Sequence, residues 1–214
     1  MTEAAERGFR EAIERIEKVS AVEVVVVVRP RLWRWLVPHI VLGMLVMLAV
    51  LAFELFSEDY EFELWTILVL AALTPLAGAL LVELIPPLAR IATPARVVDP
   101  MLATAAHAAF HEMGVHGTRM RTGLLVFVAL HERRVALAGD RAIVDHVGEP
   151  GLQRRARMLE EKLTAGGEAV AAALAAMAPD FAAALPRTED DVNELSDVVH
   201  VRAPRPQRFR GRAA

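Results

Sequence analysis

The histidines of one expected helix are the first residues whose type and spacing suit chemistry. His107 and His111 are four positions apart, so they share a helix face that is suited to binding a metal ion. His111-Glu112 followed by His116 superficially resembles a zinc-protease motif, but that motif needs histidines at i and i+4. His111 and His116 are five apart, and we expect Gly114 to break the helix between them. We therefore predict an ordinary, partly buried helix face with no metal ligand.

A second candidate site consists of charged residues at the ends of expected strands. Arg119 and Arg121 precede one strand, and Asp140 follows the next. Paired arginines suit a phosphate group, and open α/β sheets bind ligands at strand ends. The sequence thus predicts a ligand-binding site of Arg119, Arg121 and Asp140, with Arg141 and Asp145 beside it. Solvated loop charges are the plain alternative.

Several kinds of chemistry are absent from the sequence. The chain has no cysteine, which excludes a disulfide framework, a thiol nucleophile and any thiolate-bound metal. It has no glycine-rich phosphate loop, nucleophile elbow or paired-carboxylate motif. With 24 basic and 27 acidic side chains, it lacks the positive field of a general nucleic-acid binder. We predict no catalytic residue, no cofactor and no nucleic-acid partner.

Two long uncharged stretches account for the high apolar content, 55% of the 214 residues. They run from Trp35 to Phe53 and from Leu64 to Val82. A helix of about 20 apolar residues crosses the hydrocarbon core of a bilayer. We predict a transmembrane hairpin over residues 35–89, with spans at about 35–54 and 64–85, so the lipid bilayer is an expected partner.

Details of the two stretches support this hairpin and orient it. Trp33, Trp35 and Trp65 flank the stretches, where tryptophan is enriched in membranes, and Gly43 and Gly78 permit close helix approach. Arginines and lysines lie before the first span and after the second, whereas the loop between has none and carries acids. By the positive-inside rule, both termini are expected to be cytoplasmic, at the cell (inner) membrane. A re-entrant hairpin is the alternative topology.

The remaining sequence predicts a single α/β domain in two pieces, residues 1–34 and 97–201. Two strongly apolar strands separated by a helix indicate a parallel pair joined by a crossover, and the crossover here contains both spans. In the first piece we expect a helix over 1–20 and a strand over 21–29. In the second piece we expect a helix from Pro100 to about Met113, strands over 124–130 and 133–140 that are antiparallel to each other, and helices over Leu152–Leu163 and Glu168–Met177. An edge strand over 198–201 and a disordered basic tail over 202–214 are expected to follow.

Three strand blocks, Val22–Val28, Leu124–Leu130 and Arg133–Asp140, together with the helix end Phe110–His116 that lies between the first two, resemble the TPM domain, also called the TPM phosphatase domain, of YgcG-like bacterial membrane proteins. The resemblance covers about residues 3–29 and 100–185. It implies an α/β/α sandwich fold, here split by an inserted transmembrane hairpin.

The resemblance implies an accessory role in assembling or repairing membrane complexes, and for some members an acid phosphatase activity. Typical members carry Asp-Asn-Gly in a loop associated with metal binding, whereas this chain has Arg121-Thr122-Gly123. Their later Gly-Tyr-Gly stretch is replaced here by Gly139–Ala142. A cation site at this loop is therefore not expected.

The leading hypothesis is a membrane-anchored binding or assembly module, with a membrane protein complex as its partner. A phosphatase or other hydrolase on the same fold is the alternative, and a small pore is a third. Two further contacts are open: Arg154, Arg155 and Arg157 with anionic lipid, and the arginine tail with lipid, RNA or an acidic protein.

Overall fold

The computed structural model describes residues 2–32, 36–58, 60–85, 87, 95–188, 194, 195 and 199–201. Trp33, Trp35, Asp59, Pro86 and the basic tail, on which parts of the sequence interpretation rest, lie outside these residues. The chain divides into two compact units, one formed by Met1–Leu32 with Pro100–Ala214 and the other by Trp33–Asp99. Each unit is described by itself.

The first unit is built on a four-stranded mixed sheet in the order β3-β2-β1-β4. β1 (Glu23–Arg29) pairs in parallel with β2 (Gly123–Ala129) and with the two-residue β4 (His200–Val201). β3 (Arg134–Gly139) pairs antiparallel with β2. The valine-rich run and the Leu124 run are therefore neighbouring parallel strands, and the predicted antiparallel return is confirmed.

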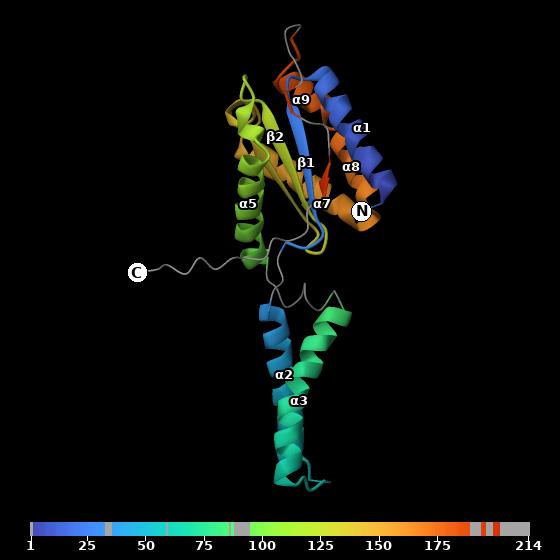
Figure 1. Cartoon of the computed structure of the whole chain (residues 1–214), viewed down its shortest axis with the longest axis vertical. Coiled ribbons are helices and arrows are strands. Elements are labelled where there is room, and N and C mark those ends of the chain that lie inside the picture. Colours follow the sequence, from blue (N-terminus) through green and yellow to red (C-terminus); the bar gives the residue numbers. More distant parts are fainter. Residues whose placement is uncertain are drawn as a thin grey trace, which may run out of the picture. The chain divides into compact units, whose positions relative to one another are not determined.

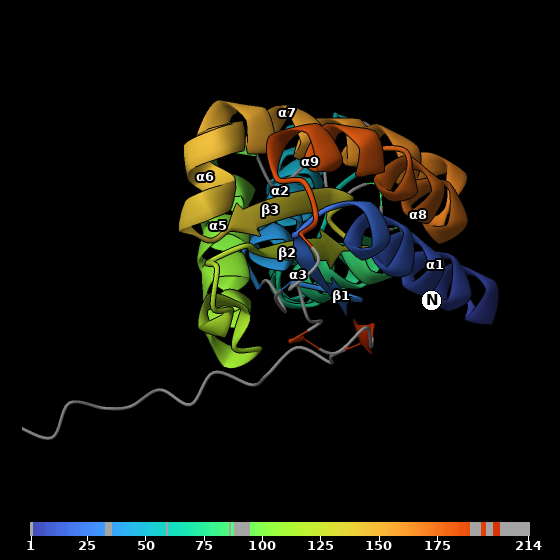
Figure 2. The same cartoon turned by 90° about the horizontal axis from the view of Figure 1, so that it is seen from above.

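Both faces of this sheet are buried because side chains on a strand alternate between faces. On one face, Val24, Val26 and Val28 pack with Leu124 and the apolar sides of surrounding helices. On the other face, Val25, Val27 and Phe127 pack with α5 (Ala95–Glu112). Figures 1 and 2 show α5 on one side of the sheet and the other helices of the unit opposite it. The prediction of a mixed α/β fold is confirmed.

The helices opposite α5 come from both ends of the chain. α1 (Glu3–Val19) begins at Thr2, whose side chain accepts a hydrogen bond from the Ala5 amide, as an N-cap does. α8 packs closely against α1, since a Cβ at Gly8 would lie 3.2 Å from the Cβ of Ala171. The remaining elements of this layer are α6 (Arg141–Val147), α7 (Glu149–Lys162), η2 (Leu163–Ala165), α8 (Gly167–Ala175) and α9 (Ala178–Ala184).

The helices differ from the sequence prediction in three places. α5 begins at Ala95 rather than at Pro100, so this proline lies inside the helix. α6 was not predicted; it follows directly on β3. The expected helix Glu168–Met177 ends at Ala175, and Pro179 stands in the first turn of α9 instead of ending a helix. A proline fits the first turn because its missing N–H has no helical partner there.

The second unit is a hairpin of α2 (Leu36–Phe56) and α3 (Leu64–Leu84). Within the described residues, His39–Phe56 and Leu64–Leu84 are long and apolar enough to cross a membrane, with mean hydropathies of 2.3 and 2.2. A third such stretch, Gly167–Ala184, has a mean hydropathy of 1.2. It comprises α8 and α9, whose apolar residues belong to the core of the α/β unit.

Small residues bring the two helices of the hairpin together. A Cβ built on Gly78 would lie 2.7 Å from the Cα of Gly43, and one built on Gly43 would lie 2.7 Å from the carbonyl oxygen of Pro75. The expected close approach at these glycines is therefore confirmed. At one end of the hairpin, Nε2 of His39 lies 3.2 Å from Oε2 of Glu83. Glu83 thus pairs with the other helix of the hairpin.

Glu54 is a buried acid on α2, and its burial allows a prediction about the stability of the hairpin. Glu54 is only 6% exposed, and neither of its carboxylate oxygens has a hydrogen-bond partner among the described residues. Burying an unpaired carboxylate is unfavourable. Replacing Glu54 with leucine should therefore stabilise the hairpin by about 1–3 kcal/mol, an effect measurable by thermal unfolding in detergent with circular dichroism.

The matched control for this change is Glu61→Leu, at an exposed acid in the loop between the helices. It should leave the melting temperature nearly unchanged, because exposed side chains contribute little to stability. A Glu54→Leu variant that melts below the unmodified chain would show that the carboxylate has a stabilising partner.

Candidate functional site

The predicted site residues lie together at one edge of the sheet. Glu23 is in register with Gly123 in the parallel pair, and Leu124 is in register with Gly139 in the antiparallel pair. This edge is therefore the amino end of β1 and β2 and the carboxyl end of β3. The rule that ligands bind at the carboxyl ends of parallel strands, which motivated the prediction, does not apply to this edge.

A tight turn holds Arg121 in place. The amide of Arg121 donates to the carbonyl of Thr118 at 3.1 Å, and the amide of Thr122 donates to Oγ1 of Thr118 at 3.0 Å. Arg121 has a φ of 56°, in the left-handed region that non-glycine residues seldom adopt. Its carbonyl accepts from the amide of Ala142 at 3.0 Å, so the turn is tied to the start of α6.

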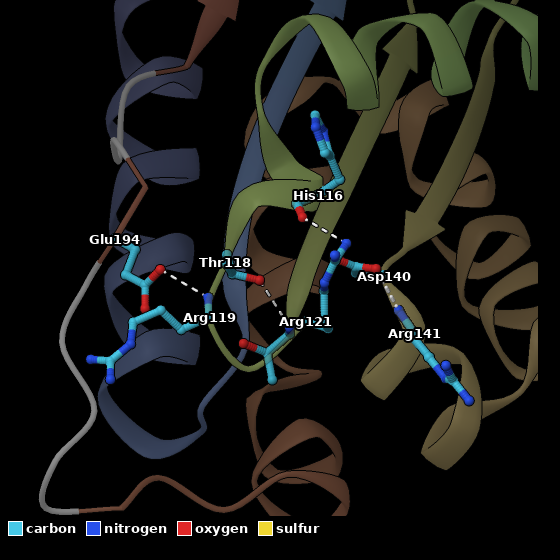
Figure 3. Close-up of polar contacts among 8 residues, drawn as sticks. His116, Thr118, Arg119, Arg121, Asp140, Arg141 and Glu194 are labelled. Carbon is cyan, nitrogen blue, oxygen red and sulfur yellow. Dashed lines mark hydrogen bonds and ion pairs between the residues drawn. The ribbon is translucent and has the colours of Figure 1, made fainter.

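The guanidinium of Arg121 joins two neighbouring segments (Figure 3). Nη1 donates to the carbonyl of His116 at 3.0 Å and lies 3.7 Å from Oδ2 of Asp140. His116 belongs to η1 (Val115–Gly117), the short helix that follows α5. We call this arrangement of Arg121, Asp140 and the His116 carbonyl the arginine clamp.

Asp140 is a helix cap as well as the acid of the arginine clamp. Its Oδ1 accepts from the amide of Arg141 at 2.7 Å at the start of α6, and its own amide donates to the carbonyl of Gly123 at 2.8 Å. The side chain is 11% exposed, and Oδ2 is buried with no hydrogen-bond partner in the described part of the chain. Arg121 supplies the positive charge that balances this buried oxygen.

Arg119 does not join the arginine clamp. Its amide donates to Oε2 of Glu194 at 3.0 Å (Figure 3). The amides of Glu194 and Leu195 both donate to Oε2 of Glu23 at 3.2 Å. Arg141 pairs with Asp145 at 3.7 Å. Arg121 and Arg141 thus each pair with an acid, and Arg119 contacts one through its backbone amide, so the anion pocket stays a prediction.

Glu23 and Glu194 belong to this edge, although sequence reasoning did not select them. Glu23 is 5% exposed at the start of a strand whose next five residues are buried valines. An acid at the start of such a run signals a buried carboxylate that needs donors. Here the donors are backbone amides, and Glu23 fixes the segment at residues 194 and 195 beside the sheet.

The oxygen atoms around Arg121 offer a poor site for a calcium or magnesium ion. Oxygen ligands such as carboxylates and carbonyls suit calcium or magnesium, but the carbonyl of His116 and Oδ2 of Asp140 already face the guanidinium of Arg121. Across the part of the chain that the structure describes, no group of three or more His, Asp or Glu side chains is arranged to hold a metal. The arginine thus supplies the positive charge at this loop.

The histidines are arranged differently from the sequence interpretation. His107 and His111 lie on α5, as predicted, but both are exposed rather than partly buried. Gly114 ends the helical path with a φ of 69°, and the chain then turns so that the rings of His111 and His116 have their centres 5.0 Å apart. His111 and His116 are five residues apart, which does not fit the zinc-protease motif, but the turn nevertheless brings their imidazole rings together.

Removing the guanidinium should weaken the α/β unit. Arg121→Ala deletes the hydrogen bond to the His116 carbonyl and leaves Oδ2 of Asp140 buried without this cation. We expect a loss of about 1–2 kcal/mol in the free energy of unfolding, at the low end for such a pair because the arginine side chain is largely exposed. The loss of unfolding free energy in Arg121→Gly should be about 0.5–1 kcal/mol smaller than in Arg121→Ala, since glycine adopts the positive φ without strain. Urea denaturation measures both.

Arg141→Ala is the matched control for these changes, since its ion pair with Asp145 is fully on the surface. It should change stability by less than about 0.5 kcal/mol. If Arg121→Ala is as stable as this control, the arginine clamp makes no contribution to folding.

The fold and this edge define a mixed α/β protein whose conspicuous charged residues hold its own backbone together. No family model matches the chain, and no curated protein matches it. Among solved structures it is similar to the NMR structure of the BA42 protein from the psychrophilic bacterium Bizionia argentinensis, at 14% identity and a TM-score of 0.55, over 94% of each chain. A likeness at this identity shows the fold alone.

Proposed function

We propose that this chain is a membrane-anchored binding or assembly module, with a TPM-like α/β/α domain interrupted by a two-span hairpin. The observation that carries the proposal is the surface of the hairpin. Each of its two apolar windows is only 11% buried. Soluble proteins rarely expose apolar patches of such extent, which are characteristic of membrane or protein contact.

The charges beside the hairpin support an orientation with both termini in the cytoplasm. Arg29 and Arg31 lie just before the hairpin, and the loop between its helices contains Glu58 and Glu61 but no basic residue. Cytoplasmic segments next to spans are enriched in arginine and lysine. Both parts of the α/β domain would then lie on the cytoplasmic side of the membrane.

A role in binding is favoured over catalysis by what the charged edge does. Arg121 and Asp140 hold the loop before β2 against α6 and η1, and Glu23 and Glu194 hold backbone amides. Each of these side chains is engaged with the protein itself, so none of the four is left to act as a nucleophile or general base. A scaffold of this kind suits recognition of a membrane protein complex.

Topology is tested with reporter fusions at Glu58, in the loop between the helices, and at the C-terminus. The two positions should report opposite sides of the membrane, and the protein should remain in the membrane fraction after carbonate washing. Reporters on the same side would refute the two-span topology. Release by carbonate would refute the membrane anchor.

The binding role is tested by affinity purification of the full chain in a mild detergent, with assembly of membrane complexes compared in a deletion strain. A reproducible partner and a defect in its complex are expected. Purified protein that cleaves a phosphoester, with the activity lost in Asp140→Ala, would instead make the chain a hydrolase. An Asp140→Asn variant that keeps the helix cap separates loss of the acid from loss of folding.

A further inference from the structure

Two imidazoles from different segments meet on the surface of the α/β unit, and neither takes part in the proposed function. The ring centres of His111 on α5 and His116 on η1 are 5.0 Å apart, with an angle of 56° between the ring planes. The rings are therefore not stacked face to face. Both residues are exposed, so the space between their outer edges is open to an ion from solvent.

The separation of the rings is that of two histidines on one metal ion. Metal–nitrogen bonds of about 2.0–2.1 Å and angles of about 90–110° at the metal place the centres of two ligating imidazoles about 4.5–5.2 Å apart. The separation of His111 and His116 lies inside this range. Rotation of either ring about its side-chain bonds can aim a nitrogen at the shared position without moving the backbone.

The backbone that carries the two rings is fixed by contacts on both sides of the turn. The amide of Gly114 donates to the carbonyl of His111 at 3.2 Å, and the amide of Gly117 donates to the carbonyl of Gly114 at 2.8 Å. Val115, between them, is fully buried. The His116 carbonyl accepts from Arg121, while the His116 ring points away from the arginine clamp (Figure 3).

We propose that His111 and His116 form a surface site for a divalent transition-metal ion of the class that prefers imidazole, namely Zn²⁺, Cu²⁺ or Ni²⁺. Two imidazole nitrogens supply half of a tetrahedral set, and water completes it. Ca²⁺ and Mg²⁺ prefer oxygen ligands and do not bind here. Binding links the end of α5 to η1 and so stabilises the segment that leads into β2.

His107 provides a matched control, because it is an exposed histidine on the same helix, one turn before His111. The ring contacts described for His111 involve Phe110 and His116. Arg121 acts on the site only by holding the His116 carbonyl, so it is a positioning residue.

Zn²⁺ and Cu²⁺ alone are the probes, added to the full chain purified in detergent without a polyhistidine tag. Calorimetry should give saturable binding of one Zn²⁺ per chain, and the electron paramagnetic resonance spectrum of bound Cu²⁺ should show coupling to two nitrogens. His111→Ala and His116→Ala should each weaken Zn²⁺ binding by at least about tenfold. His107→Ala should leave it unchanged.

Three results would overturn the proposal: no saturable binding of either ion, binding that survives both His111→Ala and His116→Ala, or binding that falls equally in His107→Ala. All three histidines are exposed, so the variants should keep the circular dichroism spectrum of the unmodified chain. A further readout is thermal stability, which Zn²⁺ should raise in the unmodified chain and in His107→Ala but not in His116→Ala.

Discussion

Replacing Gly123 with alanine is expected to unfold or severely destabilise the α/β unit. A Cβ at this position would overlap the carbonyl oxygen of Val115 and lie 2.7 Å from its Cγ1. Neither neighbour can retreat, because Val115 is fully buried and Gly123 is paired in the sheet with Glu23. The carbonyl of Gly123 also accepts the amide of Asp140, so moving the strand breaks the connection to α6.

The expected cost is about 3 kcal/mol or more, above the usual range for overpacking, because the clash is with backbone rather than a flexible side chain. Urea denaturation of the full chain, followed by circular dichroism, measures it. Gly117→Ala is the matched control in the same segment, since a Cβ there has no atom within 4 Å. It should change stability by less than about 0.5 kcal/mol. Equal stability of the two variants would show that η1 does not pack on the start of β2.

The sheet could be predicted from the sequence because its signals are local and strong. Five consecutive valines follow Glu23, and a run of apolar residues follows Gly123, so both strands had to be buried on two faces. The short connection at residues 131 and 132 favours an antiparallel return for the next strand. The parallel and antiparallel pairings were predicted in this way, but the register comes from the structure.

The start of α5 and the presence of α6 were not predicted, because Pro100 and Asp140 each fit two structural roles. Pro100 is common in a first helical turn, but a helix also tolerates it in the interior when one hydrogen bond is given up, and α5 starts five residues earlier. Asp140 at a strand end suggests a ligand residue, yet aspartate is also a favoured N-cap. In the structure it caps α6, a seven-residue helix that has too few residues for a periodic apolar pattern to reveal it.

The same ambiguity limited the prediction of how the charged residues at the amino end of β1 and β2 contact one another. The sequence correctly suggested that Arg121 and Asp140 are close, because both flank strands that lie side by side. It did not reveal that the guanidinium faces a backbone carbonyl and a buried carboxylate, since such contacts depend on the three-dimensional path of the turn. Glu194 is 75 positions from Arg119, and no local pattern relates the two.

The second large effect is expected at the helix crossing of the hairpin, where Gly78→Leu should separate α2 from α3. A Cβ on Gly78 already lies 2.7 Å from the Cα of Gly43 and 3.0 Å from the carbonyl oxygen of Leu42. Both neighbours are backbone atoms, so the helices must move apart to admit any side chain. Lipid chains are as apolar as leucine, so packing between helices, rather than hydrophobic burial, holds such a pair together in a membrane.

Gly78→Ala should cost about 1–3 kcal/mol, and Gly78→Leu should cost more. Ala77→Leu is the matched control, because it places the same side chain at the adjacent, exposed position of α3. Thermal unfolding in detergent, followed by circular dichroism, should rank the melting temperatures in the order Ala77→Leu, Gly78→Ala, Gly78→Leu, from highest to lowest. The contact between His39 and Glu83 spans the same two helices, so separating them should also weaken this pair. If the two leucine variants melt at the same temperature, close packing at Gly43 and Gly78 does not hold the hairpin together.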